Sequence, residues 1–288
     1  MKSFSIVGAG RLGTALGAAL VRKGWEAVAI LDKDAGAARE SRRIIGRGRA
    51  ATDLRRAACP AGVVIIAVPD DAVEGVAAKL AKSAAPWAGR TVLHTSGLLP
   101  ARALAPLAKA GARVASLHPV QSFPRKDAPA ALFRGIVWGF DGDLGAFAAA
   151  RTIAGGLGGG ILMLSEGQKP LYHAACSLAS NALVALEGTA VRLLLAAGIG
   201  PEEAAGTLLP LAQGTLQNVN NFGLGKSLTG PVARGDIATV GRHLAALRGH
   251  PEALEVYRAL GKQALLLVPK GAVSPARLKA MKRLLEGG

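Results

Sequence analysis

Hydrophobic and polar residues follow two different periods along the first half of the chain. Short runs of Val, Ile, Leu and Ala alternate with longer stretches whose apolar residues recur every three or four positions. One run, VVIIAV, is continuously apolar, which is typical of a strand buried on both faces of a parallel sheet. We predict strands at 4–10, 26–32, 62–70, 90–97, 112–120, 133–143 and 159–167, with helices at 11–24 and 144–159.

Beyond Glu166 the strand pattern stops and the sequence reads as helical, with breaks at 196–203, 220–236 and 247–253. Alternating strands and helices followed by helices alone indicate two domains. We therefore predict an α/β fold with a Rossmann-type doubly wound sheet in residues 1–165. An all-helical C-terminal domain should occupy residues 166–288.

The composition is that of a globular protein with a large core. Of the 288 residues 50% are hydrophobic and only 4% aromatic, so the interior must consist mainly of small and aliphatic side chains. Cys59 and Cys176 lie far apart, form no metal-binding or redox motif, and suit a reducing cytosol. The longest apolar run, 181–200, is interrupted by Glu187 and Arg192. With no signal peptide before the first strand, we expect a cytoplasmic protein without a metal or a membrane span.

The formal charge of +16 raises the question of an anionic partner. Seven arginines fall between Arg39 and Arg56, yet no aromatic residue lies among them. Nucleic-acid-binding proteins usually combine basic residues with aromatic side chains or carry a recognised module. We therefore predict no nucleic-acid partner and a small, anionic substrate.

The sequence GAGRLG places Gly8, Gly10 and Gly13 between a predicted strand and a predicted helix, and Asp32 ends the next strand. This context indicates a dinucleotide site, in which the first glycine permits a tight turn and the second lets the backbone approach a pyrophosphate. The third allows the helix to pack closely on the sheet, with its N-terminus facing the phosphates.

The choice between NAD and NADP stays open. A carboxylate at Asp32 favours NAD because it would bind the ribose hydroxyls and repel a 2′-phosphate. Lys33 follows directly, however, and Arg39, Arg42 and Arg43 lie on the next helix, where they could hold a 2′-phosphate.

Polar residues follow three predicted strands, in the segments 68–71 (VPDD), 94–97 (HTSG) and 117–123 (LHPVQSF). Ligands of doubly wound sheets bind beyond the carboxyl ends of the strands, so these segments should face the nicotinamide and the substrate. The predicted cofactor-binding residues are Gly8, Gly10, Arg11, Leu12, Gly13, Asp32, Lys33, Val68, Pro69, His94 and Ser96.

Three of the five histidines, His94, His118 and His173, lie in these segments or at the start of the helical domain, and we expect them to converge. The other two, His243 and His250, read as surface residues. At 100° per residue, His173, Ser177, Ser180 and Asn181 share one face of the helix that begins after Lys169, which predicts a polar stripe facing the site.

The segments GAGRLG, VPDDAV, HTSG, SLHPVQSF, YHAACSLASN and LTGPVARGD together resemble a group of predicted NAD(P)-dependent oxidoreductases. Those proteins join a Rossmann-like domain to a C-terminal domain of unknown function. The chain is more distantly similar to pyrroline-5-carboxylate reductase, prephenate dehydrogenase and the 6-phosphogluconate dehydrogenase superfamily. The resemblance implies a helical second domain like the C-terminal domain of the last group, and often a homodimer formed through its helices.

Hydroxyacid dehydrogenases of that superfamily carry a lysine and, four residues later, an asparagine on the first helix after the Rossmann domain. Lys169 occupies the lysine place here, but His173 stands where the asparagine is expected, and Asn181 follows two turns later. The segment CSLASN is similar to the small-residue helix of pyrroline-5-carboxylate reductase. His118 with Pro119 resembles a motif of prephenate dehydrogenase.

These features predict hydride transfer between NAD or NADP and a C=O or C=N carbon of a small anionic substrate. His173 is the predicted acid/base because histidine titrates near neutral pH, with Lys169 as the alternative. Ser96, His118 and Asn181 are predicted to orient the substrate. The alternative function is a dinucleotide-binding sensor or scaffold without turnover.

In the segment TGPVARGD, Arg234 is a candidate clamp for a carboxylate or phosphate, in its own site or in that of a partner subunit. Asp236 is either the partner of Arg234 or an N-terminal helix cap, and the cap is the simpler interpretation.

Overall fold

The computed structural model describes residues 2–54, 61–83 and 85–287, and the chain forms two compact units, Met1–Leu178 and Ala179–Gly288. The units divide after Leu178, whereas the predicted domain boundary lies near residue 165. Two of the seven arginines counted above, Arg55 and Arg56, and Cys59 lie outside the described residues.

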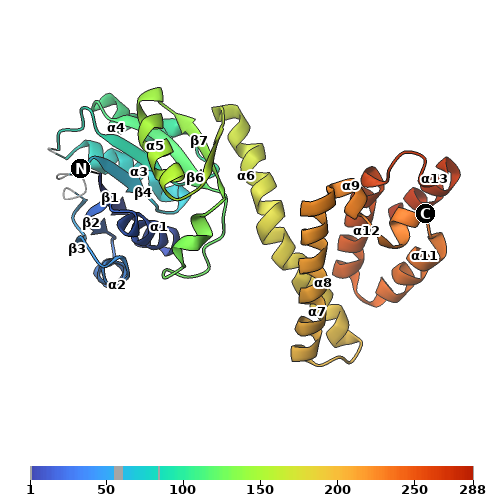
Figure 1. The fold of residues 1–288 in the computed structure, drawn as a ribbon. Helices are drawn as coiled ribbons and strands as arrows, with labels where there is room; N and C mark the ends of the chain where they lie inside the picture. Colours follow the sequence, from blue (N-terminus) through green and yellow to red (C-terminus); the bar gives the residue numbers. More distant parts are fainter. Residues whose placement is uncertain (1, 55–60, 84, 288) are drawn as a thin grey trace. The chain divides into compact units, whose positions relative to one another are not determined.

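The first unit is built on one eight-stranded sheet with the order β3-β2-β1-β4-β5-β6-β7-β8 (Figure 1). All seven predicted strands are confirmed within a few residues of their expected ends. The short β3 is an addition to the prediction. The strands are β1 (Ser3–Val7), β2 (Glu26–Leu31), β3 (Arg49–Ala51), β4 (Val63–Ile66), β5 (Thr91–His94), β6 (Arg113–Pro119), β7 (Val137–Gly142) and β8 (Gly160–Met163).

The sheet is mixed rather than fully parallel, which corrects the prediction of a parallel sheet. β6 pairs antiparallel with β7, so that His118 lies opposite Gly139, while every other neighbouring pair is parallel. The hydrophobic pattern could not show this, because it reports which faces are buried and not the direction of a strand. The carboxyl ends of β1, β4, β5 and β6 still meet at one edge of the sheet.

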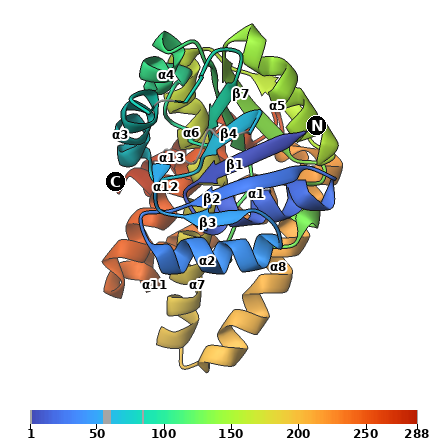
Figure 2. The same cartoon turned by 90° about the vertical axis from the view of Figure 1, so that its left-hand side faces the viewer.

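Helices cover both faces of the sheet (Figure 2). Side chains of α1 (Arg11–Arg22) and α5 (Leu144–Gly156) pack in one hydrophobic core, to which Ile45 of α2 (Ala35–Ile45) also belongs. Side chains of α3 (Asp70–Ala81) and α4 (Ala105–Lys109) pack in a second core. Two cores separated by a sheet are what a doubly wound fold requires. The single turns η2 (Ala101–Leu104), η3 (Ala130–Phe133) and η4 (Glu166–Gln168) complete the unit.

The helix that follows η4 is not regular. It begins as α6 (Lys169–Ser177), continues through a π-helical segment, η5 (Leu178–Ala182), and then becomes α7 (Leu183–Ala196). A π-helix has more residues per turn than an α-helix, so the 100° spacing does not hold across η5. The predicted polar stripe is therefore interrupted. Ser177 precedes η5, while Ser180 and Asn181 lie within it.

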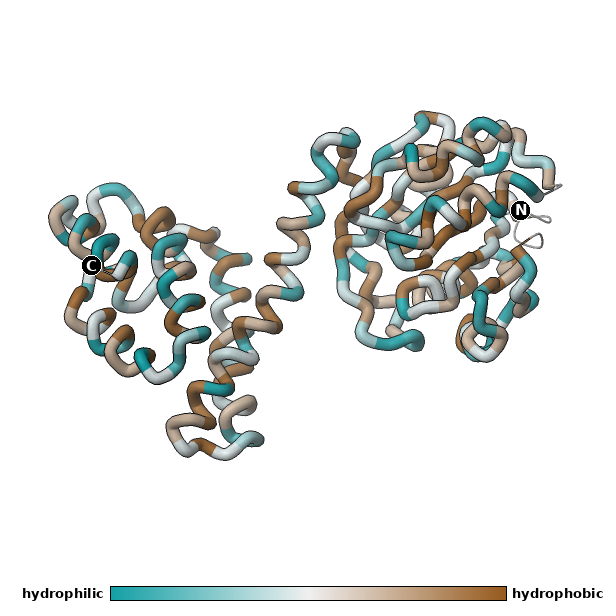
Figure 3. The backbone as a smooth tube through the Cα atoms, turned by 180° about the vertical axis from the view of Figure 1, so that it is seen from behind, coloured by the Kyte–Doolittle hydropathy of each residue, from teal (hydrophilic) through white to brown (hydrophobic). Residues whose placement is uncertain are grey.

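The second unit is entirely helical among its described residues, as predicted. A small hydrophobic core joins α11 (Ile237–Ala246) and α13 (Pro275–Glu286) through Val240, Leu244, Met281 and Leu285. Hydrophobic segments nevertheless occur all along the helices of this unit (Figure 3). Besides α7, its helices are α8 (Pro201–Phe222), α9 (Leu224–Ser227), α10 (Gly230–Arg234), α11 (Ile237–Ala246), η6 (Leu247–Gly249), α12 (Pro251–Leu267) and α13 (Pro275–Glu286).

Among the described residues, one helical stretch, Glu166–Ala196, is long and apolar enough to cross a membrane by length and composition alone. Its most apolar window has a mean hydropathy of 1.4, and none of that window is buried in the single chain. Near its start, Lys169 of α6 forms a hydrogen bond with Ser116 of β6.

Candidate dinucleotide and catalytic site

The glycine turn has the geometry that the sequence predicts. Gly8 adopts a φ of +107°, which L-residues rarely tolerate, and a side chain there would collide with the backbone of Ala67. A Cβ on Gly13 would collide with the carbonyl oxygen of Gly8, so this glycine allows α1 to approach the turn closely. A Cβ on Gly10 would meet no atom within 4 Å, which leaves the backbone of the turn open to a ligand.

The first turn of α1 offers backbone N–H groups that the described residues do not use. Gly10 caps the helix without a side-chain hydrogen bond, and the first turn carries no acidic residue. The first backbone bond into the turn runs from the Thr14 N–H to the Gly10 carbonyl, so the amides of Arg11, Leu12 and Gly13 remain unpaired. Such amides, at the positive end of the helix dipole, fit the pyrophosphate of a dinucleotide.

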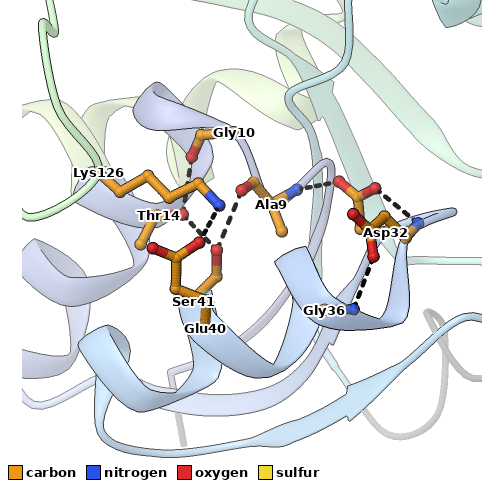
Figure 4. Close-up of polar contacts among 9 residues, drawn as sticks. Ala9, Gly10, Thr14, Asp32, Gly36, Glu40, Ser41 and Lys126 are labelled. Carbon is orange, nitrogen blue, oxygen red and sulfur yellow. Dashed lines mark hydrogen bonds and ion pairs between the residues drawn. The ribbon is translucent and has the colours of Figure 1, made fainter.

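Asp32 fixes the glycine turn (Figure 4). One carboxylate oxygen accepts a hydrogen bond from the Ala9 N–H at 2.8 Å and the other from the Asp34 N–H at 3.0 Å. A carboxylate has further lone pairs, so Asp32 can still accept hydrogen bonds from ribose hydroxyls. Lys33 beside it is exposed, and so are the three arginines considered for a 2′-phosphate, Arg39, Arg42 and Arg43.

A buried hydroxyl pair joins α2 to the same turn (Figure 4). The Thr14 hydroxyl lies 2.7 Å from the Gly10 carbonyl, and the Ser41 hydroxyl lies 3.0 Å from the Ala9 carbonyl. The two hydroxyl oxygens are themselves 2.7 Å apart. At the surface, Lys126 forms an ion pair of 2.6 Å with Glu40 of α2, which links the loop after β6 to this helix. The glycine turn is thus held by the carboxylate of Asp32 and by the hydroxyl of Ser41 in α2.

His94 braces the turn that follows β5. It is fully buried, its Nε2 lies 3.1 Å from the Pro100 carbonyl, and its Nδ1 accepts a hydrogen bond from the Ser96 N–H at 3.2 Å. Burial lowers the pKa of His94 to about 4, so the ring is neutral with its proton on Nε2. Both ring nitrogens of His94 form hydrogen bonds within this turn, so His94 supports the site by fixing the conformation of the turn.

Ser96 belongs to the same turn. Its hydroxyl oxygen accepts hydrogen bonds from the Leu98 N–H at 3.1 Å and from the Leu99 N–H at 2.9 Å. The hydroxyl keeps its own proton to donate. Val68, which follows β4, lies against the glycine turn, because a Cβ on Gly8 would be 3.0 Å from Val68 Cγ1. Pro69, the next residue, is the N-terminal cap of α3.

Lys169 joins the start of α6 to the strand ends. Its Nζ is fully buried and donates to the Ser116 hydroxyl at 2.7 Å and to the Ser96 carbonyl at 3.2 Å. The Ser116 hydroxyl in turn donates to the Ser96 carbonyl at 3.0 Å. Burial lowers the pKa of Lys169 to about 8, although the carboxylates of Asp141 and Asp70 act against this shift.

His173 lies one helical turn after Lys169 and next to His118. The two imidazole rings meet edge to face with their centroids 5.9 Å apart. Both lie against Gly97, where a Cβ would be 2.5 Å from His173 Cδ2 and 3.0 Å from His118 Nε2. Both rings are partly exposed, and the His173 nitrogens have no hydrogen-bond partner among the described residues. The structure therefore brings together His118, His173, Lys169, Ser96 and His94 at one edge of the sheet.

The remaining candidates lie in the second unit. Asn181 is exposed within η5, and Arg234 is exposed at the end of α10. Asp236 caps α11, because its carboxylate accepts hydrogen bonds from the Thr239 N–H at 3.0 Å and from the Thr239 hydroxyl at 2.8 Å. These bonds hold the pKa of Asp236 below its usual value. The N-cap interpretation is confirmed.

Sequence reasoning missed Tyr172. Its hydroxyl lies 2.8 Å from His118 Nδ1, and its ring meets that of His118 edge to face at 5.7 Å. One signal was available, since Tyr172 directly precedes His173 near the start of the same helix. Within the described residues, no group of three His, Cys, Asp or Glu side chains is placed to hold a metal ion.

The mixed eight-stranded sheet and its glycine turn define a domain of the Rossmann type. Residues 2–119 match the Rossmann-like domain family, and residues 136–264 match a family described as a domain of unknown function, DUF2520. The chain thus combines a Rossmann-like domain with a DUF2520 domain, which confirms the resemblance drawn from the sequence motifs. No curated protein matches the sequence.

Solved structures share the fold over nearly the whole chain. A Bacteroides fragilis protein assigned as an NADP oxidoreductase is 23% identical, with a TM-score of 0.76 over 91% of this chain and 97% of that chain. A reductive aminase from Aspergillus terreus, solved with NADPH and ethyl-5-oxohexanoate, is 20% identical, with a TM-score of 0.61 over 100% and 93%. A pyrroline-5-carboxylate reductase from Coxiella burnetii is 15% identical, with a TM-score of 0.59 over 99% and 97%.

Proposed function

We propose that the protein is an NAD(P)-dependent oxidoreductase that transfers a hydride to or from a C=O or C=N carbon of a small anionic substrate. One observation carries the proposal. Two partly exposed imidazoles, those of His118 and His173, lie at the same sheet edge as a glycine turn with unpaired helix amides. Solved proteins of this fold that are named as NADP oxidoreductase, reductive aminase and pyrroline-5-carboxylate reductase support it.

The protein's own residues have separate tasks in this proposal. When bound, the reduced nicotinamide supplies a hydride to the substrate carbon. His173 supplies a proton to the substrate oxygen or nitrogen, and takes it back in the reverse reaction, because its ring nitrogens are otherwise unpaired. Lys169 holds the start of α6, and hence His173, against the ends of β5 and β6.

The test is a titration of the purified protein with NADH and NADPH, followed by a metabolite screen at the nicotinamide absorbance. We expect binding of one or both cofactors and oxidation of the preferred one in the presence of a carbonyl or imine substrate. Binding without oxidation across 2-oxo acids, ketones, aldehydes and imines would instead favour a sensor or scaffold. The titration also decides between NAD and NADP.

We further propose that the protein is a homodimer in which helices of the second unit cover each other. Large apolar side chains of α7 and α8, such as Val184, Leu209 and Leu211, are more than half exposed in the single chain. A soluble protein rarely leaves so many apolar side chains in contact with water. A second copy is a better cover than a membrane, because Glu187 and Arg192 interrupt the apolar helix. Sedimentation at micromolar concentration would show a dimer.

A further inference from the structure

The contact between Tyr172 and His118 determines where the His118 ring carries its proton. The Tyr172 hydroxyl lies 2.8 Å from His118 Nδ1. His118 is neutral because burial lowers its pKa to about 4, and the neighbouring His173 and Lys169 add to this shift. A neutral imidazole has a single N–H, so the direction of this hydrogen bond fixes the tautomer.

Tyr172 is the donor in this bond. Burial raises the pKa of its hydroxyl, which therefore keeps its proton at neutral pH. The other side chain near the hydroxyl is Cys176, whose sulfur is a weak acceptor compared with an imidazole nitrogen. The hydroxyl proton thus points to His118 Nδ1, and the proton of the imidazole is left on Nε2.

The Nε2 atom of His118 faces the space beside Gly97. A Cβ on Gly97 would be 3.0 Å from His118 Nε2 and 2.5 Å from His173 Cδ2. The absence of a side chain at Gly97 therefore keeps both rings accessible. Nε2 has no hydrogen-bond partner among the residues that the structure describes. A neutral N–H donor with no acceptor thus stands next to the proposed acid/base.

We propose that Tyr172 is a positioning residue that holds His118 in the Nε2–H form, and that His118 donates this hydrogen bond to the oxygen of a carbonyl substrate. The inference rests on the proposed function and narrows its substrate class from C=O or C=N to C=O. As the carbon gains the hydride from the reduced nicotinamide, the C=O electron pair moves to oxygen. The oxygen takes a proton from His173, while His118 keeps its own.

The charges around His118 favour a carbonyl over an imine. A carbonyl oxygen accepts a hydrogen bond and gains negative charge as the hydride arrives, so a fixed N–H donor stabilises it. A protonated imine is a cation that needs an acceptor instead. The ammonium group of Lys169, which together with burial keeps His118 neutral, would also oppose that cation. Of the nearby carboxylates, Asp141 already accepts a hydrogen bond of 2.6 Å from the Ala101 N–H.

The tautomer can be measured directly by two-bond ¹H–¹⁵N correlation NMR of the full-length protein with ¹⁵N-labelled histidine. We expect His118 Nδ1 to resonate as an unprotonated acceptor and Nε2 as a protonated nitrogen, with the signals assigned from a His118→Asn variant. Tyr172→Phe should abolish the preference and give a mixture of tautomers. A proton on Nδ1 in the unmodified protein would overturn the inference.

The second unit provides a matched control. There Tyr257 contacts His243 with the same geometry, a hydroxyl to Nδ1 distance of 2.8 Å and ring centroids 5.7 Å apart. Tyr257→Phe should change the signals of His243 and leave those of His118 and the turnover unchanged. If Tyr257→Phe altered the His118 tautomer or the turnover as much as Tyr172→Phe, the effect would be a general loss of stability, and the inference would be wrong.

Kinetics test the substrate class with 2-oxo acids and ketones against cyclic imines of matched carbon skeleton. Carbonyl substrates should be preferred, and Tyr172→Phe should lower kcat about 10-fold or more with KM within about twofold. Turnover of imines alone would overturn this inference and leave the proposed function intact. Binding of NAD(P) without turnover of either class would overturn the proposed function and the substrate class with it.

Discussion

The helices of the two units differ in how much of their surface the single chain covers. In the first unit, α1 buries eight of its 12 residues against the sheet and α2. In the second, α7 buries none of its 14 residues, and α8 buries only Ala204 among 22. A sheet can cover a helix from the same chain, whereas a few helices with a small common core cannot cover one another fully. The first unit therefore completes its own core, while α7 and α8 of the second unit stay largely uncovered in the single chain, which is the observation behind the proposed dimer.

The largest expected effect comes from a glycine of the first unit. Gly13→Ala would drive a Cβ into the Gly8 carbonyl oxygen, and the backbone cannot move aside cheaply. We therefore expect the free energy of unfolding to fall by more than about 3 kcal/mol and the binding of NAD(P) to be lost. Urea unfolding and calorimetric titration measure both quantities.

Gly214→Ala in α8 is the matched control, because a Cβ there meets nothing within 4 Å in the single chain. It should stabilise the protein by up to about 1 kcal/mol. A destabilising Gly214→Ala would place a neighbouring chain at this position and sharpen the contrast between the units.

Removal of the proposed acid/base is expected to have the next largest effect. His173→Ala should lower kcat by about 10²–10⁴-fold, because no other ring with free nitrogens replaces it beside His118. Binding of NAD(P), measured by fluorescence titration, should stay unchanged. His250→Ala, an exposed histidine of the second unit, serves as the control. An active His173→Ala enzyme would remove this residue from the mechanism.

Exposed leucines of the two units should respond differently to a charge. Leu211 in α8 is 68% exposed and Leu144 at the start of α5 is 83% exposed. Leu211→Asp should weaken a dimer by about 100-fold or more, because a buried unpaired carboxylate costs several kcal/mol. Leu144→Asp should have no effect on sedimentation. Equal behaviour of the two variants would contradict the assignment of the interface to the second unit.

Acid should weaken the first unit through His94. Its folded-state pKa of about 4 lies below the ordinary 6.5, so the unfolded chain binds the proton first as the pH falls. The stability contributed by neutral His94 is complete above pH 6.5 and is lost between about pH 6.5 and 4, by about 3 kcal/mol in total. Urea unfolding of a His94→Asn variant should lack this part of the pH dependence. His250→Asn should retain it.

The smallest effect concerns Asp32. Asp32→Asn keeps an acceptor for the Ala9 N–H but removes the charge, so NADH affinity should fall about 10-fold. NADPH affinity should rise or stay constant, because the negative charge facing a 2′-phosphate is gone. Calorimetric titrations of both cofactors measure the ratio. Equal losses of NADH and NADPH affinity would show that Asp32 acts only by holding the glycine turn.

The sequence by itself determined the local structure of this protein. The glycine spacing, the strand at 62–70 and the proline after Lys169 each fix a backbone conformation through neighbouring residues alone. The strands, the glycine turn and the change to helices after Glu166 were therefore predictable. The hydrophobic period also located the polar strand ends that carry His94, Ser96 and His118.

Only the tertiary structure decided the direction of β7, the π-helical segment and the partners of the polar side chains. Lys169 and His173 are four residues apart, yet one is held in the interior by Ser116 while the other is free beside Gly97. The pairing of Tyr172 with His118 likewise joins residues from an antiparallel strand edge and a separate helix. Such contacts link positions far apart in the chain, and the periodicity of a sequence carries no information about them.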